Sequence, residues 1–176
     1  MQTKPETLPE LTSGGKHRRF TFVLLDQFTL LCFSAAMESL RIANRMAGRE
    51  LYSWNLVGEG GETVTCSAGT VFQVDSDFSE LQRDDTIMVC GGIEVQKATS
   101  KRVLSWLRRE ARKGLTIAGL CTASYTLAKA GLLDGKRATI HWENSDSFAE
   151  EFEDVDLTKS VFVIDGNRLS TAGGTS

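Results

Sequence analysis

Short apolar segments alternate with longer amphipathic segments along most of this chain. Six apolar segments are too short for buried helices and are typical of strands covered on both faces: residues 20–25, 54–57, 86–90, 115–120, 138–141 and 161–164. Helical spacing of apolar residues occurs at 30–46 and 100–113, and a shorter helix is expected at 122–130, before Gly131. Such alternation implies right-handed β-α-β crossovers. The sequence therefore predicts a three-layer α/β fold, in which helices cover both faces of a mostly parallel sheet.

Two regions depart from this alternation. Residues 51–78 contain Gly58, Gly60, Gly61 and Gly69, which predicts short strands and tight turns without a long helix. Residues 1–18 hold both prolines of the chain among Thr, Ser, Gly and Lys, which predicts a disordered leader. We therefore expect one folded domain over residues 19–176.

Composition and charge narrow the class of protein. The chain has 176 residues, 41% of them hydrophobic, and a formal net charge of -3. A chain of this length buries roughly 68–70% of its unfolded surface, enough for a stable core without metals or disulfides. The charge offers no broad footprint for nucleic acid. The N-terminus lacks the apolar run of a secretory signal, and the longest uncharged stretch, residues 114–128, is shorter than a membrane helix of roughly 20 residues. We expect a cytoplasmic protein without membrane contact.

The four cysteines are Cys32, Cys66, Cys90 and Cys121, and none of them belongs to a C-x-x-C pair. Neither a zinc knuckle nor a redox dithiol is indicated. We expect four free thiols, no metal site and no cofactor.

The segment from Gly119 to Ala123 follows a predicted strand and opens a predicted helix. A nucleophile on a sharp strand-to-helix turn needs small residues two positions before and after it, and Cys121 has them. A helix N-terminus favours the thiolate, and the Thr122 N–H would face a developing oxyanion. The adjacent pair Gly91 and Gly92 is expected to supply a second donor. A buried structural cysteine fits the same spacing.

His141 follows a predicted strand and is the candidate base for Cys121. A strand-end histidine that is bonded to the backbone is the alternative interpretation. If the protein is an enzyme, Cys121 and His141 are therefore the expected catalytic pair.

Several separated motifs together resemble a known family. They are Cys121 with residues 127–136 (LAKAGLLDGK) and 138–142 (ATIHW), preceded by 24–30 (LLDQFTL), 38–41 (ESLR) and 90–92 (CGG) and followed by 170–176 (STAGGTS). Together they resemble the ThiJ/PfpI branch of the class I glutamine-amidotransferase-like superfamily. More narrowly, the chain is similar to the N-terminal sensor domain of AraC-type transcriptional regulators, in the group that answers to glycine betaine, carnitine or arginine.

The resemblance implies a three-layer flavodoxin-like sandwich with a strand-to-helix cysteine elbow. It implies that a final helix and a C-terminal helix-turn-helix domain follow Ser176, so that the chain would be an excised or truncated ligand-sensing domain. DNA would be contacted only through that missing domain. Because AraC-type regulators usually act as pairs, the resemblance also implies a homodimer.

Departures from the enzymatic branches favour binding over catalysis. Thr122 stands where PfpI-type enzymes have a histidine, and residues 27–33 (QFTLLCF) contain no acid. A thiol without a paired acid or an oriented base tends to stay protonated in apolar surroundings. A cysteine-dependent PfpI-like hydrolase or hydratase is the alternative function, and a thiol redox sensor is a further one.

The expected ligand site combines aromatic faces with backbone donors at the elbow. Its predicted lining is Phe28, Phe33, Gly91, Gly92, Cys121, Thr122, Tyr125, His141 and Trp142. An aromatic face attracts a quaternary ammonium or guanidinium group by about 0.5–2 kcal/mol, and N–H groups at a helix N-terminus suit a carboxylate. We therefore expect a small metabolite, either a quaternary amine or an amino-acid zwitterion, as the effector. The same aromatic residues fit a plain core role.

Two charged segments are interpreted as solvated surfaces. One is basic and includes Lys101, Arg102, Arg108, Arg109, Arg112 and Lys113, and the other is acidic and includes Glu150, Glu151, Glu153, Asp154 and Asp156. A dimer contact is the alternative interpretation of the basic segment.

Overall fold

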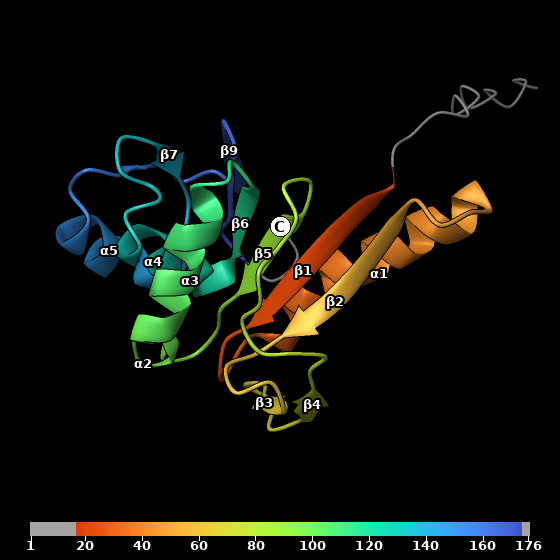
Figure 1. Ribbon diagram of the computed structural model, residues 1–176. Coiled ribbons are helices and arrows are strands. Elements are labelled where there is room, and N and C mark those ends of the chain that lie inside the picture. Colours follow the sequence, from red (N-terminus) through yellow and green to blue (C-terminus); the bar gives the residue numbers. More distant parts are fainter. Residues whose placement is uncertain (1–16, 174–176) are drawn as a thin grey trace, which may run out of the picture.

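The computed structural model describes residues 17–173 and is built around a six-stranded sheet (Figure 1). The strand order is β2-β1-β5-β6-β10-β9. These strands are β1 (Arg18–Leu24), β2 (Tyr52–Val57), β5 (Thr86–Cys90), β6 (Thr116–Leu120), β9 (Phe162–Asp165) and β10 (Arg168–Thr171). All neighbours pair in parallel except β9, which lies antiparallel to β10 at one edge. The predicted mostly parallel sheet is confirmed.

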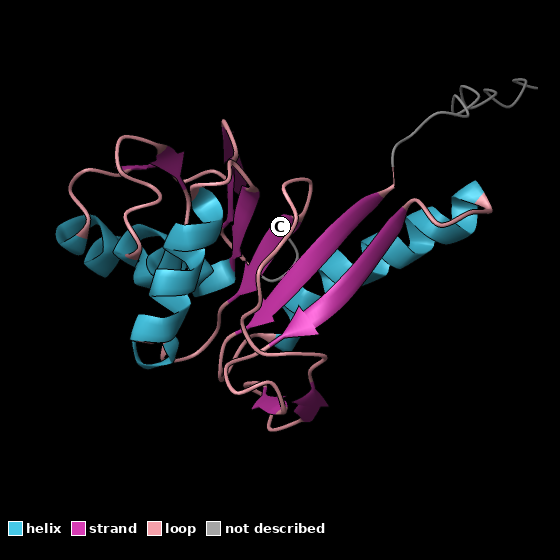
Figure 2. Ribbon diagram, viewed as in Figure 1, coloured by secondary structure: helices cyan, strands magenta, loops and turns pink. Residues whose placement is uncertain are grey.

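Helices cover the two faces of this sheet. They are α1 (Leu30–Ala47), α2 (Val95–Ala98), α3 (Lys101–Ala111), α4 (Ser124–Lys129) and α5 (Ser145–Glu151). Strand side chains alternate between two cores: Val23 and Ile117 pack in the same cluster as residues of α3, α4 and α5, whereas Phe22 and Leu24 pack with residues of α1. Figure 2 shows α2 to α5 grouped together and away from α1. The three-layer α/β architecture is therefore confirmed.

Helix α3 (Lys101–Ala111) lies within the segment 100–113 that the sequence predicts to be helical. Ser100 Oγ accepts a hydrogen bond of 3.1 Å from the Val103 amide, which satisfies an otherwise free donor of the first turn. Gly114, with φ +85°, follows the last turn and provides the left-handed residue that closes it. Capping at both ends thus sets the length of α3.

Two expectations about strands need correction. The segment 138–141 is not a strand of the central sheet, because β7 (Arg137–Ala138) only pairs with the short β8 (Asp156–Leu157). The backbone of Thr139 is hydrogen-bonded to side chains instead of to a neighbouring strand. Its N–H donates to Ser170 Oγ (2.9 Å), and the Thr139 carbonyl accepts from Ser124 Oγ (2.7 Å). Strand β10, which the apolar-run criterion does not detect, pairs with β6 in the central sheet instead.

Two further expectations, about residues 51–78 and about the cysteines, are met within the described residues. Between residues 51 and 78 only strands and turns occur, with β3 (Thr63–Thr65) and β4 (Val71–Gln73) forming a hairpin. The four cysteines are buried and free. Most of the predicted leader, residues 1–16, and residues 174–176 of the terminal motif lie outside the described residues, while Arg18 already belongs to β1. No helix in residues 17–173 is long and apolar enough to cross a bilayer.

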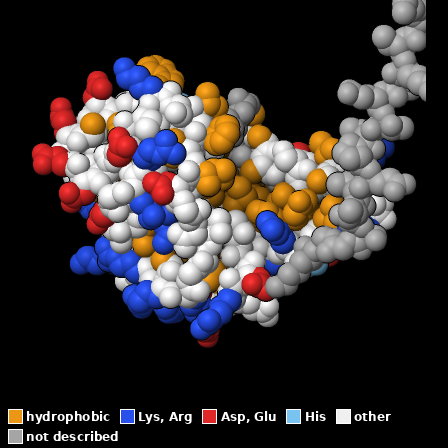
Figure 3. Space-filling view, turned by 90° about the horizontal axis from the view of Figure 1, so that it is seen from above, with side chains coloured by type: hydrophobic (Ala, Val, Ile, Leu, Met, Phe, Trp, Pro, Cys, Tyr) orange, Lys and Arg blue, Asp and Glu red, His pale blue; other side chains and the backbone are white. Residues whose placement is uncertain are grey.

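One face of the sheet is only partly covered. Helix α1 packs over β1 and its neighbours, but Phe162 and Ile164 of β9 are each 57% exposed beside it. Figure 3 shows the resulting band of hydrophobic side chains in a hollow on this side of the molecule. Mostly parallel sheets are normally covered on both faces, so an exposed apolar band on such a sheet is unusual.

Substitution of Gly92 tests how tightly the ends of the strands are packed. A Cβ atom at Gly92 would lie 2.0 Å from Gln27 O and 2.6 Å from Thr29 N, so Gly92→Ala should lower the unfolding free energy by about 3 kcal/mol through overpacking. Gly135→Ala is the control, because Gly135 has φ +68° and nothing within 4 Å. Left-handed strain alone should cost it about 1 kcal/mol. Urea denaturation measures both, and equal losses would contradict the packing argument.

Candidate functional site

Strand β6 ends in a sharp turn that holds Cys121 in the left-handed region, with φ +61°. A Cβ atom at Gly119 would lie 3.0 Å from Ser124 N and 3.1 Å from the Ala123 carbonyl carbon. Only a residue without a side chain fits this approach comfortably. Cys121 then opens the 3-10 turn Cys121–Ala123, which leads into α4. This is the cysteine elbow that the sequence predicts.

The end of β5 packs directly against the elbow. A Cβ atom at Gly91 would lie 2.5 Å from Ala123 N, and Thr122 Oγ1 donates a 2.8 Å hydrogen bond to Gly92 O. The Gly91 amide donates to Leu120 O at 3.3 Å. Gly91 therefore brings two backbones together, and its N–H is already engaged rather than aimed at a ligand as expected.

The thiol of Cys121 is almost enclosed, since the residue is 3% exposed. Its Sγ lies 3.8 Å from Thr29 Oγ1, and its amide donates to Thr171 Oγ1 at 3.3 Å. Burial raises the pKa of Cys121 and outweighs the hydrogen bonds from Thr29 and from the Thr122 amide, which favour the thiolate. The negative charge of Glu143 also raises this pKa. At neutral pH the thiol is therefore protonated.

An open hollow of about 280 Å³ lies at the elbow. Its lining residues are Thr29, Gly92, Ile93, Glu94, Cys121, Thr122, His141, Glu143 and Asn144. Four of the predicted site residues meet here, namely Gly92, Cys121, Thr122 and His141. His141 Nδ1 lies 3.7 Å from Glu143 Oε2, and no hydrogen bond within residues 17–173 joins its ring to Cys121. The predicted base thus lines the same hollow as the thiol without a hydrogen bond to it.

The predicted aromatic residues do not line this hollow. Phe28 and Phe33 are buried beside each other, with ring centroids 5.6 Å apart in an edge-on contact. Tyr125 faces α5, where its hydroxyl donates to Glu151 Oε1 at 3.1 Å, and Trp142 is 73% exposed outside the hollow. An aromatic cage around the ligand is thus absent from the described elbow, because these rings serve the core or the surface.

Three polar residues of the hollow are not singled out by the sequence analysis: Thr29, Glu94 and Asn144. Thr29 is the N-cap residue of α1, and Glu94 is that of α2 with φ +55°. The only available signal was position, since each lies directly before a helix or turn at the carboxyl edge of the sheet, where ligands gather. The rim of the hollow carries two carboxylates, Glu94, which forms an ion pair with Lys97, and Glu143.

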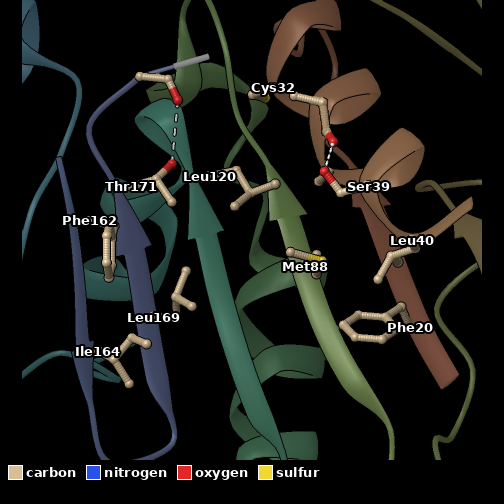
Figure 4. A pocket seen from close by; sticks show the side chains of 13 residues that line it. Phe20, Cys32, Ser39, Leu40, Met88, Leu120, Phe162, Ile164, Leu169 and Thr171 are labelled. Carbon is tan, nitrogen blue, oxygen red and sulfur yellow. Dashed lines mark hydrogen bonds between the residues drawn. The ribbon is translucent and has the colours of Figure 1, made fainter. Parts of the chain in front are cut away.

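A second, larger hollow of about 530 Å³ lies between α1 and the uncovered part of the sheet (Figure 4). Its walls are mostly apolar and include Phe20, Leu40, Met88, Leu120, Phe162, Ile164 and Leu169. Thr171 and Cys32 also line it. Thr171 Oγ1 accepts a hydrogen bond from the Cys121 amide, and Cys32 Sγ donates a hydrogen bond of 3.0 Å to Thr29 O. The apolar hollow and the elbow hollow are therefore joined by direct hydrogen bonds.

The polar side chains of the elbow hollow include hydroxyl, amide and carboxylate groups. Within residues 17–173, no three His, Cys, Asp or Glu residues are grouped closely enough to hold a metal ion. The hydroxyls of Thr29 and Thr122 and the amide of Asn144 provide hydrogen-bonding groups, and the two carboxylates provide negative charge.

Known proteins show where this arrangement recurs. The model of the DJ-1/PfpI family matches residues 18–176. The HTH-type transcriptional regulator CdhR of Pseudomonas aeruginosa is 40% identical over 157 residues, which are 89% of this chain and 46% of CdhR. The crystal structure of an AraC family transcriptional regulator from Pseudomonas putida aligns with a TM-score of 0.75 and 26% identity, covering 89% of this chain and 84% of that one. The chain thus spans about half the length of the curated regulator that it matches.

Similarity also extends to an enzyme. An isonitrile hydratase of Pseudomonas putida is 36% identical over 84 residues, which are 47% of this chain and 37% of the hydratase. Similar sequences therefore occur in regulators and, over about half of this chain, in an enzyme. The side chains around Cys121 are needed to distinguish the two functions.

The protonated state of the Cys121 thiol predicts slow alkylation at neutral pH. Iodoacetamide should label Cys121 slowly at pH 7 and faster as the pH rises, because only the thiolate reacts and burial raises the pKa of Cys121. Thr29→Val removes a hydrogen bond that favours the thiolate and should slow labelling further, by up to about tenfold for one pKa unit. Mass spectrometry against Cys121→Ser assigns the label. Labelling at pH 7 that is faster than in the urea-unfolded chain would contradict the argument.

Proposed function

Because the chain belongs to the DJ-1/PfpI family, we propose that it is the effector-binding domain of an AraC-type transcriptional regulator. The observation that carries this proposal is a buried thiol that lines a small polar hollow and has no hydrogen bond to a base within residues 17–173. The 40% identity to the regulator CdhR supports it. In this function, the elbow holds a small metabolite instead of attacking it.

The protonation state of the cysteine distinguishes a binding site from a site of nucleophilic catalysis. A catalytic cysteine needs a base in hydrogen-bond reach or a depressed pKa. Here burial raises the pKa of Cys121, and the nearby Glu143 carboxylate acts in the same direction. The Thr29 hydroxyl, at 3.8 Å, is a neutral group that takes up no proton at neutral pH. The site is therefore well suited to hydrogen bonding and poorly suited to attack.

The chemical class of the effector follows from the rim of the hollow. Glu94 and Glu143 provide two carboxylates, which attract a cationic group. Thr29 and Asn144 offer hydrogen-bond donors for a carboxylate on the same molecule. We propose a small cytoplasmic zwitterion or quaternary amine, held by carboxylates in place of the aromatic faces that the sequence suggested.

The longer regulator also accounts for the apolar hollow. We propose that a final helix, continuing from the terminal strand, covers Phe162, Ile164 and Leu169, and that a helix-turn-helix domain beyond it contacts DNA. Support comes from the exposed apolar band and from Gly173, which lines that hollow near the end of the described chain. We further propose that the regulator acts as a homodimer.

Calorimetric titration tests the effector class. A panel of quaternary amines and amino acids should contain a compound that binds, and Glu143→Gln and Glu94→Gln should each weaken its binding about tenfold, which corresponds to the loss of one charged contact. Glu150→Gln, an exposed carboxylate on α5 outside the hollow, is the matched control and should bind normally. Absence of heat with every compound of the panel would overturn the proposed class.

A cysteine-dependent hydratase is the second candidate, because Cys121 and His141 line one hollow and an isonitrile hydratase is similar over 84 residues. Its test is hydration of an isonitrile by the purified chain, followed by gas chromatography or infrared absorbance. We expect no turnover above the level of Cys121→Ser. Turnover that this substitution abolishes would replace the regulator proposal with the enzyme.

A further inference from the structure

Charge is segregated on the helical layer of the molecule. Residues 97–113, which include α3, contain seven basic residues and one acid. The basic residues are Lys97, Lys101, Arg102, Arg108, Arg109, Arg112 and Lys113. The acid, Glu110, is fully buried and paired with Arg109 and Lys113. The exposed surface of α3 is therefore strongly positive.

The neighbouring segment has the opposite charge. Residues 143–156, which include α5, contain seven acids and no Lys or Arg. They are Glu143, Asp146, Glu150, Glu151, Glu153, Asp154 and Asp156, all of them exposed. The seven basic residues of one segment thus equal in number the seven acids of the other.

These two surfaces lie on either side of α4. Arg108 of α3 donates to the Ala130 and Lys129 carbonyls at the end of α4, while Glu151 of α5 accepts from Tyr125 and Lys129 of the same helix. Figure 3 shows acidic side chains gathered at the end of the molecule that carries α5, with basic side chains next to them. The layer is therefore positive along one side of α4 and negative along the other.

Several of these charges are unused within the chain. Most basic residues of α3 have local partners, as in the 2.8 Å pair of Arg102 with Asp77. Among residues 17–173, Lys101 and Arg112 have no ion-pair partner, and neither have Asp146, Glu150, Glu153 and Asp154. The unpaired cations lie on one surface and the unpaired acids on the other.

The basic surface is also hollowed and partly aromatic. An open hollow of about 520 Å³ is lined by Lys101, Arg102, Arg109, Arg112, Phe78 and Trp106. The rings of Phe78 and Trp106 are stacked with centroids 5.3 Å apart and form an apolar floor. Cationic walls over an aromatic floor suit an acidic helical segment, whose carboxylates meet the walls while its aliphatic stems cover the rings.

We propose that α3 and α5, which flank the buried helix α4, form a self-complementary interface between two copies of this chain. A two-fold axis over α4 places the basic surface of each copy on the acidic surface of the other, so both contacts form at once. Nucleic acid is a poorer occupant, since the acidic segment and the net charge of -3 repel it. This inference rests on the homodimer of the proposed function and is independent of the effector.

Reciprocal charge reversal tests the interface by sedimentation velocity. The variant K101E/R112E reverses the two unpaired cations of the basic surface, and E150K/D154K reverses two of the four unpaired acids of the acidic surface. We expect the wild-type chain to dimerise less tightly as salt rises, and each variant alone to dimerise at least about tenfold more weakly, because like charges then face each other. An equimolar mixture of the two variants should restore a heterodimer, since both contacts are again attractive.

Controls separate this result from other causes of association. R45E/R49E makes the same charge change on exposed residues near the end of α1 and should dimerise as the wild type does. Circular dichroism checks that each variant is folded. A monomeric wild-type chain, dimers that ignore the reversals, or a mixture that stays monomeric would overturn the interface. Calorimetric effector binding by a monomeric chain would leave the proposed function intact.

Discussion

Close backbone packing around Cys121 is the constraint on which the site depends. Strand β5 ends at Gly91 and Gly92, where added Cβ atoms would lie 2.5 Å from Ala123 N and 2.0 Å from Gln27 O. The loop after β1, the end of β5 and the turn after β6 are therefore pressed together at one edge of the sheet. This packing buries the thiol, and burial in turn raises the pKa of Cys121. Backbone geometry thus determines the protonation state of the residue that forms the floor of the elbow hollow.

The same elbow serves binding or catalysis depending on what surrounds the sulfur. A turn that holds a cysteine at φ +61° directs the thiol toward a hollow, whether the site binds a ligand or catalyses a reaction. A nearby base or a depressed pKa would make it a nucleophile. In this chain His141 pairs with Glu143, and the sulfur is left with the neutral hydroxyl of Thr29. In the proposed function, the carboxylates of Glu94 and Glu143 contact the cationic group of the effector.

Periodicity and turn chemistry predicted most of the fold, but they could not assign every strand or side-chain direction. The buried parallel strands and the capped helix α3 carry strong local signals, namely unbroken apolar runs, the Ser100 cap and Gly114. Strand β10 carries none, because Arg168 and Ser170 are polar residues whose burial depends on partners far away in sequence, such as Leu132 O and the Thr139 amide. Of the predicted site, Gly92, Cys121, Thr122 and His141 meet as expected. Phe28 and Phe33 do not, since an apolar ring fits the core as well as a ligand site until its neighbours are known.

The two hollows share residues in a way that matters for the proposed regulator. Thr171 lines the apolar hollow and also holds the amide of Cys121 through its hydroxyl. Cys32 lines the same hollow and donates to the carbonyl of Thr29, whose own hydroxyl lies 3.8 Å from the Cys121 sulfur. An effector that shifts Thr29 or Cys121 therefore moves atoms that a helix in the apolar hollow would contact directly. Such short routes through hydrogen-bonded side chains are how a small ligand biases the position of a packed helix. Signal transfer in the proposed regulator thus needs only the few side chains that separate the elbow from the uncovered sheet.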